Sequence, residues 1–220
     1  MEVIQPVSVP WFIRRRWVEE LLQQRSSRLG NRLTRSLEDA TIDLLPHQVE
    51  AAAFALNRLF SGGAILADEV GLGKTIEAGL VISQLWAEGR RRILIIVPAG
   101  LRRQWAEELR SHFHLMGQIV DRARWNLIRK EGPDAFLLSC AQGPILLSYT
   151  FAYRQLESLS TVPWDLVVMD EAHRLRNVYR PENRMGRSLR EAFAKCSKLL
   201  LTATPLQNSL MELYGLVSFI

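Results

Sequence analysis

From Leu45 onward, the chain alternates short apolar runs with longer amphipathic segments, and few folds accommodate that order. The apolar runs are nearly continuous, as strands covered on both faces of a parallel sheet should be. The predicted strands are 64–67, 92–97, 145–149, 165–169 and 198–201, and the predicted helices are 46–60, 74–88, 101–113, 151–159 and 182–194. This alternation predicts an α/β fold, a mostly parallel sheet with helices on both faces, whose ligands bind at the carboxyl ends of the strands.

The stretch LADEVGLGKT (66–75) joins the first predicted strand to a predicted helix, which is the context that a phosphate-binding loop requires. Backbone N–H groups and the helix N-terminus would hold the phosphates, while Lys74 reaches the terminal ones and Thr75 holds Mg²⁺. The loop opens with two acids, which are compatible with a polyanion if their carboxylates point away from it. The expected loop residues are Asp68, Glu69, Val70, Gly71, Leu72, Gly73, Lys74 and Thr75. The alternative is an accidental Gly-Lys-Thr in a surface loop.

A second motif, DLVVMDEAH (165–173), ends an apolar strand with two adjacent acids. Asp170 is suited to hold Mg²⁺, and Glu171 is suited to orient and deprotonate an attacking water. Such a pair also occurs at a helix start, where the helix dipole favours carboxylates. The upstream loop favours the catalytic interpretation, because metal-assisted phosphoryl transfer needs both parts.

A third stretch, LLLTATPLQN (199–208), places two hydroxyls, Thr202 and Thr204, directly after a predicted strand. Taken alone, this stretch is typical of an ordinary strand–turn–helix join. Its interest comes from its position, because its strand belongs to the same predicted sheet as the two motifs above.

Composition narrows the class of protein. Hydrophobic residues make up 48% of the 220 residues, which indicates a folded globular chain, and no apolar run is long enough to span a bilayer. The first residues lack the layout of a signal peptide, so we expect a cytoplasmic protein, nucleoid-associated if bacterial, with no membrane partner. Cys140 and Cys196 stand alone without a metal-binding spacing, and no zinc site is expected. A net charge of +5 is compatible with a nucleic-acid partner without establishing one.

The change in sequence pattern near residue 45 predicts two segments. Residues 1–44 form an Arg-rich extension, with an amphipathic helix over 11–24 that carries Trp11 and Trp17 on one side. Residues 45–220 form the α/β domain. Because the chain ends on the apolar stretch LMELYGLVSFI, where a mature terminus is normally solvated, we expect this domain to be truncated at its C-terminal end.

The three motifs, in this order, resemble the first motor lobe of superfamily 2 helicases, and most closely the Swi/Snf-type branch of DNA translocases. Other stretches also look like motifs of that family: LLPHQ (44–48) like its adenine-side glutamine motif, and ILIIVPAGLRRQWAEEL (93–109) and ILLSYT (145–150) like its nucleic-acid-contacting motifs. ADEVGLGKT is that branch's usual form, and DEVGLGKTIEAG is similar to the bacterial RNA-polymerase-associated remodellers. The alanine in LTATP, where many relatives have glycine, is expected to be harmless. The resemblance covers about 45–220 and implies a RecA-like three-layer sandwich.

The resemblance also implies a role for individual residues. Gln48 would read adenine, Gly73, Lys74 and Thr75 would hold phosphates and Mg²⁺, Asp170 would bind Mg²⁺, and Glu171 would activate water. His173, Thr202 and Thr204 would couple the ATP site to the strand-binding face. Pro98, Arg102, Gln104 and Ser148 are candidate nucleic-acid contacts.

Family motors have two such lobes, and this sequence contains one, so the resemblance implies half a motor whose second lobe is supplied in cis or in trans. The function expected is Mg-ATP hydrolysis coupled to nucleic acid, with duplex DNA favoured by the LQN after LTATP. RNA polymerase or another DNA-bound complex is a candidate partner. Two alternatives stay open: an RNA helicase lobe, and a non-catalytic binding module such as a split-gene subunit or a fragment.

Overall fold

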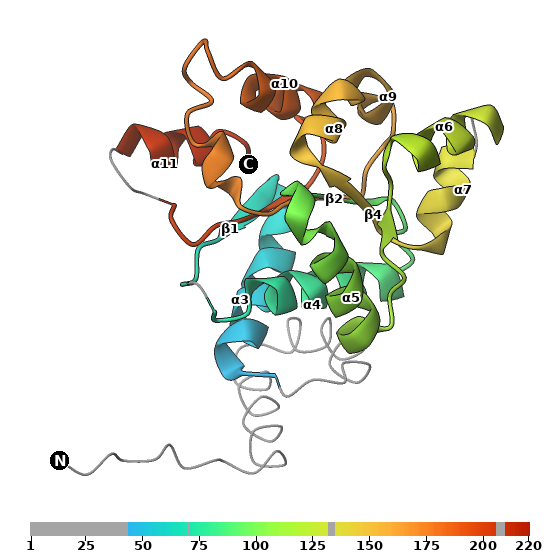
Figure 1. Cartoon of the computed structure of the whole chain (residues 1–220). Helices are drawn as coiled ribbons and strands as arrows, with labels where there is room; N and C mark the ends of the chain where they lie inside the picture. Colours follow the sequence, from blue (N-terminus) through green and yellow to red (C-terminus); the bar gives the residue numbers. More distant parts are fainter. Residues whose placement is uncertain (1–43, 70, 132–134, 206–209) are drawn as a thin grey trace.

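A computed structural model describes residues 44–69, 71–131, 135–205 and 210–220 of the chain (Figure 1). Several predictions fall on other residues and lie outside this description: the N-terminal extension with its helix over 11–24, Val70 in the phosphate loop, and the LQN at 206–208. Within the described residues, no helix is both long enough and apolar enough to span a bilayer.

Among the described residues, the centre of the fold is a six-stranded sheet in which every pairing is parallel. In chain order the strands are β1 (Gly63–Leu66), β2 (Ile93–Val97), β3 (Gln118–Ile119), β4 (Ile145–Ser148), β5 (Leu166–Met169) and β6 (Lys198–Leu201). Their order across the sheet is β1-β6-β5-β2-β4-β3. Side chains of one strand point alternately to the two faces, so Ile93 and Ile95 enter one hydrophobic core while Leu94 and Ile96 enter the other. This arrangement explains why the strands are continuously apolar.

Helices cover both faces and complete a three-layer sandwich (Figure 1). One face carries α3 (Pro46–Arg58), α4 (Lys74–Ala87) and α5 (Arg102–Phe113). The other carries α6 (Arg122–Glu131), α7 (Ala135–Gln142), α8 (Tyr149–Arg154), α9 (Leu156–Ser160), α10 (Arg184–Ala192) and α11 (Leu210–Val217). The described part of the chain also has short 3₁₀ turns at η1 (Leu59–Ser61), η2 (Ala99–Leu101) and η3 (Ala172–Leu175). The predicted α/β class is therefore confirmed, and the described residues form one RecA-like lobe.

The structure corrects the predicted elements between β2 and β5. The sequence pattern did not predict β3, α6 or α7. The predicted strand 145–149 ends one residue earlier, because Ser148 caps the next helix by accepting a hydrogen bond from the N–H of Phe151. The predicted helix 151–159 is two helices, α8 and α9, which separate at Gln155 because its backbone (φ −111°, ψ 15°) leaves the helical region.

The strand order decides which loops meet. The strand β6 lies between β1 and β5, and the register pairs Leu66 with Leu201 and Met169 with Leu200. Three strands therefore end at nearly the same level of the sheet. The segments that follow them are the predicted phosphate loop, the Asp170-Glu171 pair and the Thr202–Thr204 turn, and they are brought together at the carboxyl ends of these strands.

Candidate nucleotide site

The loop between β1 and α4 is shaped by two glycines with left-handed backbones, Gly71 (φ +88°) and Gly73 (φ +89°). Residues other than glycine rarely adopt this backbone conformation. Gly73 is also confined from outside, because a Cβ at this position would lie 2.4 Å from Nε2 of Gln48. Gly73 is therefore required both for its backbone angle and for the space beside Gln48.

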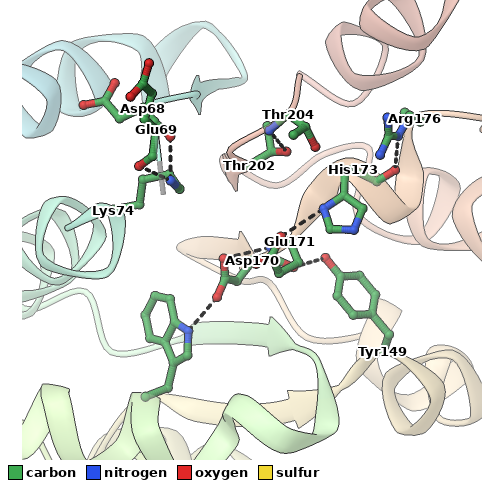
Figure 2. A network of polar contacts seen from close by, with 11 residues as sticks. Asp68, Glu69, Lys74, Tyr149, Asp170, Glu171, His173, Arg176, Thr202 and Thr204 are labelled. Atoms are coloured by element: carbon green, nitrogen blue, oxygen red, sulfur yellow. Dashed lines mark hydrogen bonds and ion pairs between the residues drawn. The ribbon is translucent and has the colours of Figure 1, made fainter. Parts of the chain in front are cut away.

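Lys74 opens α4 and its ammonium lies in the mouth of the loop. Its Nζ donates to the backbone carbonyls of Asp68 at 2.5 Å and Glu69 at 2.9 Å. Figure 2 shows that the carboxylates of these two acids point away from the ammonium. A loop that begins with two acids can receive phosphates if the carboxylates point away from them. Here the two acids present backbone carbonyls, and not charged groups, at the mouth of the loop.

Gln48 connects the start of α3 to the same loop. Its side chain is buried, with Nε2 donating to the carbonyl of Leu72 at 3.0 Å and Oε1 accepting from the N–H of Leu45 at 3.1 Å. A ring nitrogen of His47 lies 3.2 Å from the Leu72 carbonyl. The predicted adenine-reading residue thus lies directly against the phosphate loop.

Glu77 is an acid that the motif analysis missed. It lies in the first turn of α4 and is fully buried, and no N–H or O–H donor of the described residues reaches either of its carboxylate oxygens. Burial, together with the neighbouring carboxyl of Asp68, raises its pKa to about 8, so it is mainly protonated at neutral pH. Its carboxyl, that of Asp68 and a ring nitrogen of His47 lie within 4.8 Å of one another. The sequence signal was an acid on an otherwise apolar helix face.

Asp170 follows β5 and has hydrogen bonds on both carboxylate oxygens. The indole Nε1 of Trp105 donates to Oδ2 at 2.8 Å, and the N–H of Glu171 donates to Oδ1 at 2.8 Å. The hydroxyl of Tyr149 donates to its backbone carbonyl at 2.7 Å (Figure 2). Burial raises the pKa of Asp170, while the two donors and Lys74 act in the opposite direction. Trp105 and Tyr149 were not predicted as site residues, because nothing in their local spacing links them to this acid.

Glu171 has an uncommon backbone for a residue with a side chain, at φ +52°. Residues held in such conformations are frequent at functional sites, where the surrounding structure compensates the strain. Its half-exposed carboxylate lies 2.9 Å from Nδ1 of His173 in η3. Glu171 is therefore oriented by a neighbour and remains accessible to water.

The turn after β6 lies between the other two segments. The N–H of Thr202 donates to the carbonyl of Leu66 at 3.0 Å, and the N–H of Thr204 donates to the Thr202 hydroxyl at 3.2 Å. In Figure 2 these threonines lie between Lys74 and His173. The structure thus brings the predicted phosphate, metal, water and coupling residues into one neighbourhood. Their roles stay predictions.

The candidate nucleic-acid contacts lie on neighbouring segments. Pro98 follows β2, and Arg102 and Gln104 are at the surface of α5, where Gln104 bonds Glu108 at 2.8 Å. Ser148 differs from them because it is buried and its hydroxyl caps α8 at 3.3 Å from the N–H of Phe151. A direct strand contact by Ser148 stays a prediction.

Arg176 is a further residue that the motifs did not indicate. Its Nε donates to the carbonyl of His173 at 2.8 Å, and its Nη1 lies 3.3 Å from the carboxylate of Glu212 in α11. Both side chains are mostly buried. This ion pair connects η3, which carries His173, to the helix that follows the Thr202–Thr204 turn.

Comparison with known proteins gives matches in sequence and in structure. The SNF2-related domain matches residues 47–220. The chain is 36% identical over 177 residues to the uncharacterized ATP-dependent helicase YqhH of Bacillus subtilis, covering 80% of this chain and 29% of that protein. It is 37% identical over 169 residues to the RNA polymerase-associated protein RapA of Yersinia enterocolitica, covering 74% of this chain and 17% of that protein.

The SWI2/SNF2 ATPase core of Sulfolobus solfataricus, solved in complex with dsDNA, superimposes with a TM-score of 0.68 and 26% identity, covering 83% of this chain and 36% of that chain. The chain therefore spans less than a third of the length of the curated relatives above, and about a third of this solved core.

Proposed function

The chain belongs to the SNF2-related domain family, and from that premise we propose that it is the ATP-binding lobe of a nucleic-acid-dependent ATPase that acts on duplex DNA. The observation that carries the proposal is the meeting of three loops at the ends of β1, β5 and β6. They supply an ammonium and an acid pair, which are groups that phosphoryl transfer uses, and beside them the hydroxyl turn to which the family resemblance gives a coupling role.

Mg-ATP fits the groups present. Gly73 lets the loop backbone pack directly against the Gln48 amide, which a Cβ would meet at 2.4 Å, and the adjacent backbone N–H groups at the start of α4 form an anion-binding end. Thr75 and Asp170 offer the hard oxygen ligands that Mg²⁺ prefers. When bound, Mg²⁺ would neutralise charge on the transferring phosphoryl group. Lys74 would exchange its bonds with the carbonyls of Asp68 and Glu69 for bonds with phosphate oxygens.

Glu171 is the proposed general base. Its carboxylate is accessible to water and held by His173 at 2.9 Å, so it can orient a water molecule and accept its proton. The acid beside it, Asp170, has hydrogen-bond donors on both oxygens and stays available as a metal ligand. We assign the two adjacent acids separate tasks, because the oxygens of Asp170 already accept hydrogen bonds from Trp105 and Glu171, whereas the carboxylate of Glu171 is half-exposed.

Duplex DNA is the favoured nucleic acid. The solved core that this lobe resembles was in complex with dsDNA, and a relative of similar identity is RNA polymerase-associated. We therefore propose Pro98, Arg102, Gln104 and Ser148 as candidate strand contacts, a second motor lobe as the partner that closes over ATP, and RNA polymerase or another DNA-bound complex as a further partner. Without the arginines of a second lobe, hydrolysis by this lobe alone is expected to be slow.

The experiment is ATP hydrolysis measured with this chain and with a longer form that includes a second lobe, each without nucleic acid and with duplex DNA, single-stranded DNA or RNA. We expect the longer form to be stimulated most by duplex DNA, and this chain to respond little. Stimulation by RNA alone would replace the DNA proposal with the RNA helicase alternative. Absence of ATP binding in both forms would favour a non-catalytic binding module.

A further inference from the structure

Two aromatic side chains converge on Asp170 from outside the phosphate loop and the acid pair. Trp105 reaches its carboxylate at 2.8 Å, and Tyr149 reaches its backbone carbonyl at 2.7 Å. Trp105 is 1% exposed and Tyr149 is 3% exposed, so water competes little for either bond. Asp170 is therefore held at its side chain by a residue of α5 and at its backbone by a residue of α8.

The bond from Trp105 fixes the plane of the carboxylate. Oδ2 accepts from the indole, and Oδ1 accepts from the N–H of Glu171. Each oxygen thus has one donor and retains a lone pair that a cation can use. Removing the indole N–H would leave Oδ2 of this partly buried acid without its donor, and the carboxylate would be held only through Oδ1.

The bond from Tyr149 fixes the peptide that leads into Glu171. This peptide enters a residue with a left-handed backbone, at φ +52°, a conformation that surrounding contacts must support. The Tyr149 hydroxyl anchors the carbonyl on the Asp170 side of that peptide. The direction in which Glu171 presents its carboxylate therefore depends on α8 as well as on β5.

Both aromatic residues lie next to candidate strand contacts. Arg102 and Gln104 precede Trp105 within the same turn of α5, but face the surface. Ser148 directly precedes Tyr149 at the end of β4. Because a helical turn moves as a unit, a shift of these segments on binding a strand would move the two donors at Asp170.

We propose that Trp105 and Tyr149 are positioning residues that hold Asp170 and Glu171 in register and connect them to the strand-binding segments α5 and β4–α8. The inference rests on the proposed function. According to this proposal, Trp105 and Tyr149 do more than pack in the core. The orientation of Asp170, the proposed metal ligand, would depend on what α5 and α8 contact.

The first experiment is independent of ATP. In the chain labelled with ¹⁵N in its tryptophans, the Trp105 indole N–H resonance is identified by its loss in Trp105→Phe. We expect this resonance to move upfield in Asp170→Asn, because a bond to a neutral amide is weaker than a bond to a carboxylate. An unchanged resonance would overturn the positioning role of Trp105.

The second experiment measures the Mg²⁺ dependence of ATP binding. Trp105→Phe and Tyr149→Phe each remove one hydrogen bond and keep an aromatic ring, and we expect each to raise the Mg²⁺ concentration for half-maximal binding by about three- to tenfold. Matched controls are Trp164→Phe, which removes a buried indole bond to the Leu159 carbonyl at 2.9 Å, and Tyr179→Phe, which removes a hydroxyl bond to Asn177 at 3.1 Å. Equal effects in the controls would reduce the result to general destabilisation and overturn the proposal.

The third experiment tests the connection to the strand. Duplex DNA added to the labelled chain is expected to move the Trp105 indole resonance, and Arg102→Ala with Gln104→Ala is expected to weaken that response. DNA binding, followed by fluorescence polarisation, without any movement of this resonance would overturn the connection. If neither the wild-type chain nor any variant binds ATP, the proposal that this lobe binds ATP is wrong. The first experiment still decides whether Trp105 positions Asp170, because it does not depend on ATP.

Discussion

The carboxyl of Glu77 lies within 4.8 Å of the carboxyl of Asp68, and no N–H or O–H donor from another described residue reaches it. Two facing acids are compatible when one carries a proton, and burial favours the neutral form of Glu77. Asp68, an unusual first residue for a phosphate loop, is thus paired with Glu77, a second acid on the helix that follows the loop.

This pairing predicts that stability falls as pH rises. The native pKa of Glu77, about 8, lies above the ordinary value of 4.5, so the native state binds the proton more tightly than the unfolded state does. The contribution is fully present below about pH 4.5 and is lost as pH rises through about 8, by a few kcal/mol. Urea unfolding of the metal-free chain from pH 5 to 9 measures it. Glu77→Gln should flatten the profile, and the exposed control Glu157→Gln should not. An unchanged slope in Glu77→Gln would contradict the pairing.

Gly73→Ala is expected to impair the loop more than alanine at other glycines with positive φ. The substitution adds left-handed strain of about 1–2 kcal/mol and a contact 2.4 Å from the Gln48 amide. Gly89→Ala is the matched control, because its φ is +83° and no atom lies within 4 Å of its new Cβ. Thermal unfolding and Mg-ATP titration should show strain alone in Gly89→Ala, and an additional loss of ATP affinity in Gly73→Ala. Equal ATP affinities in the two variants would argue against this description of the loop.

Lys74→Ala and Glu171→Gln are expected to separate binding from chemistry. We expect the wild-type chain to bind Mg-ATP weakly, at about 0.1–1 mM, because one side of the site stays open to water. Lys74→Ala should abolish that binding, since it removes the ammonium at the mouth of the loop. Glu171→Gln should keep binding and lose turnover. Calorimetry and phosphate release measure the two effects, and fast turnover by the wild-type chain, at several per second, would contradict the half-motor proposal.

The ion pair between Arg176 and Glu212 is expected to hold η3 against α11. Because both side chains are mostly buried, removal of one partner breaks an ion pair that water screens little, and it is expected to cost about 3–5 kcal/mol. Arg176→Met and Glu212→Leu should therefore each destabilise the chain more than the double variant does. A double-mutant cycle by urea unfolding gives the coupling, and the exposed pair Arg110 and Glu107 serves as a comparison with a small expected coupling. Additive losses at Arg176 and Glu212 would show that the pair does not connect the two elements.

The local sequence pattern was sufficient to predict the fold class and most of the strands. Five of the six strands have continuous apolar runs, because both of their faces are buried, and the helices between them carry their own periodicity. The glycines, Lys74 and the Asp170-Glu171 pair were identified because their spacing along the chain reflects the loop or strand end that carries them. The strand β3 had no such signal, since it has only two residues and depends on pairing with β4. The helices α6 and α7 depend on tertiary packing, since the rings of Trp125 and Phe136 lie 5.2 Å apart and also contact Phe151 and Trp164.

Contacts between residues far apart in the sequence came from the folded chain alone. The bond from Trp105 to Asp170 joins residues 65 positions apart, and the sheet order decides that α5 reaches the end of β5. The protonation of Glu77 depends on burial and on Asp68, neither of which is a property of the helix that contains Glu77. The amino-acid pattern indicates the types of chemical groups and the strand ends that carry them. Their partners, orientation and charge arise from packing, because hydrogen bonds and desolvation depend on distance in space and not on position along the chain.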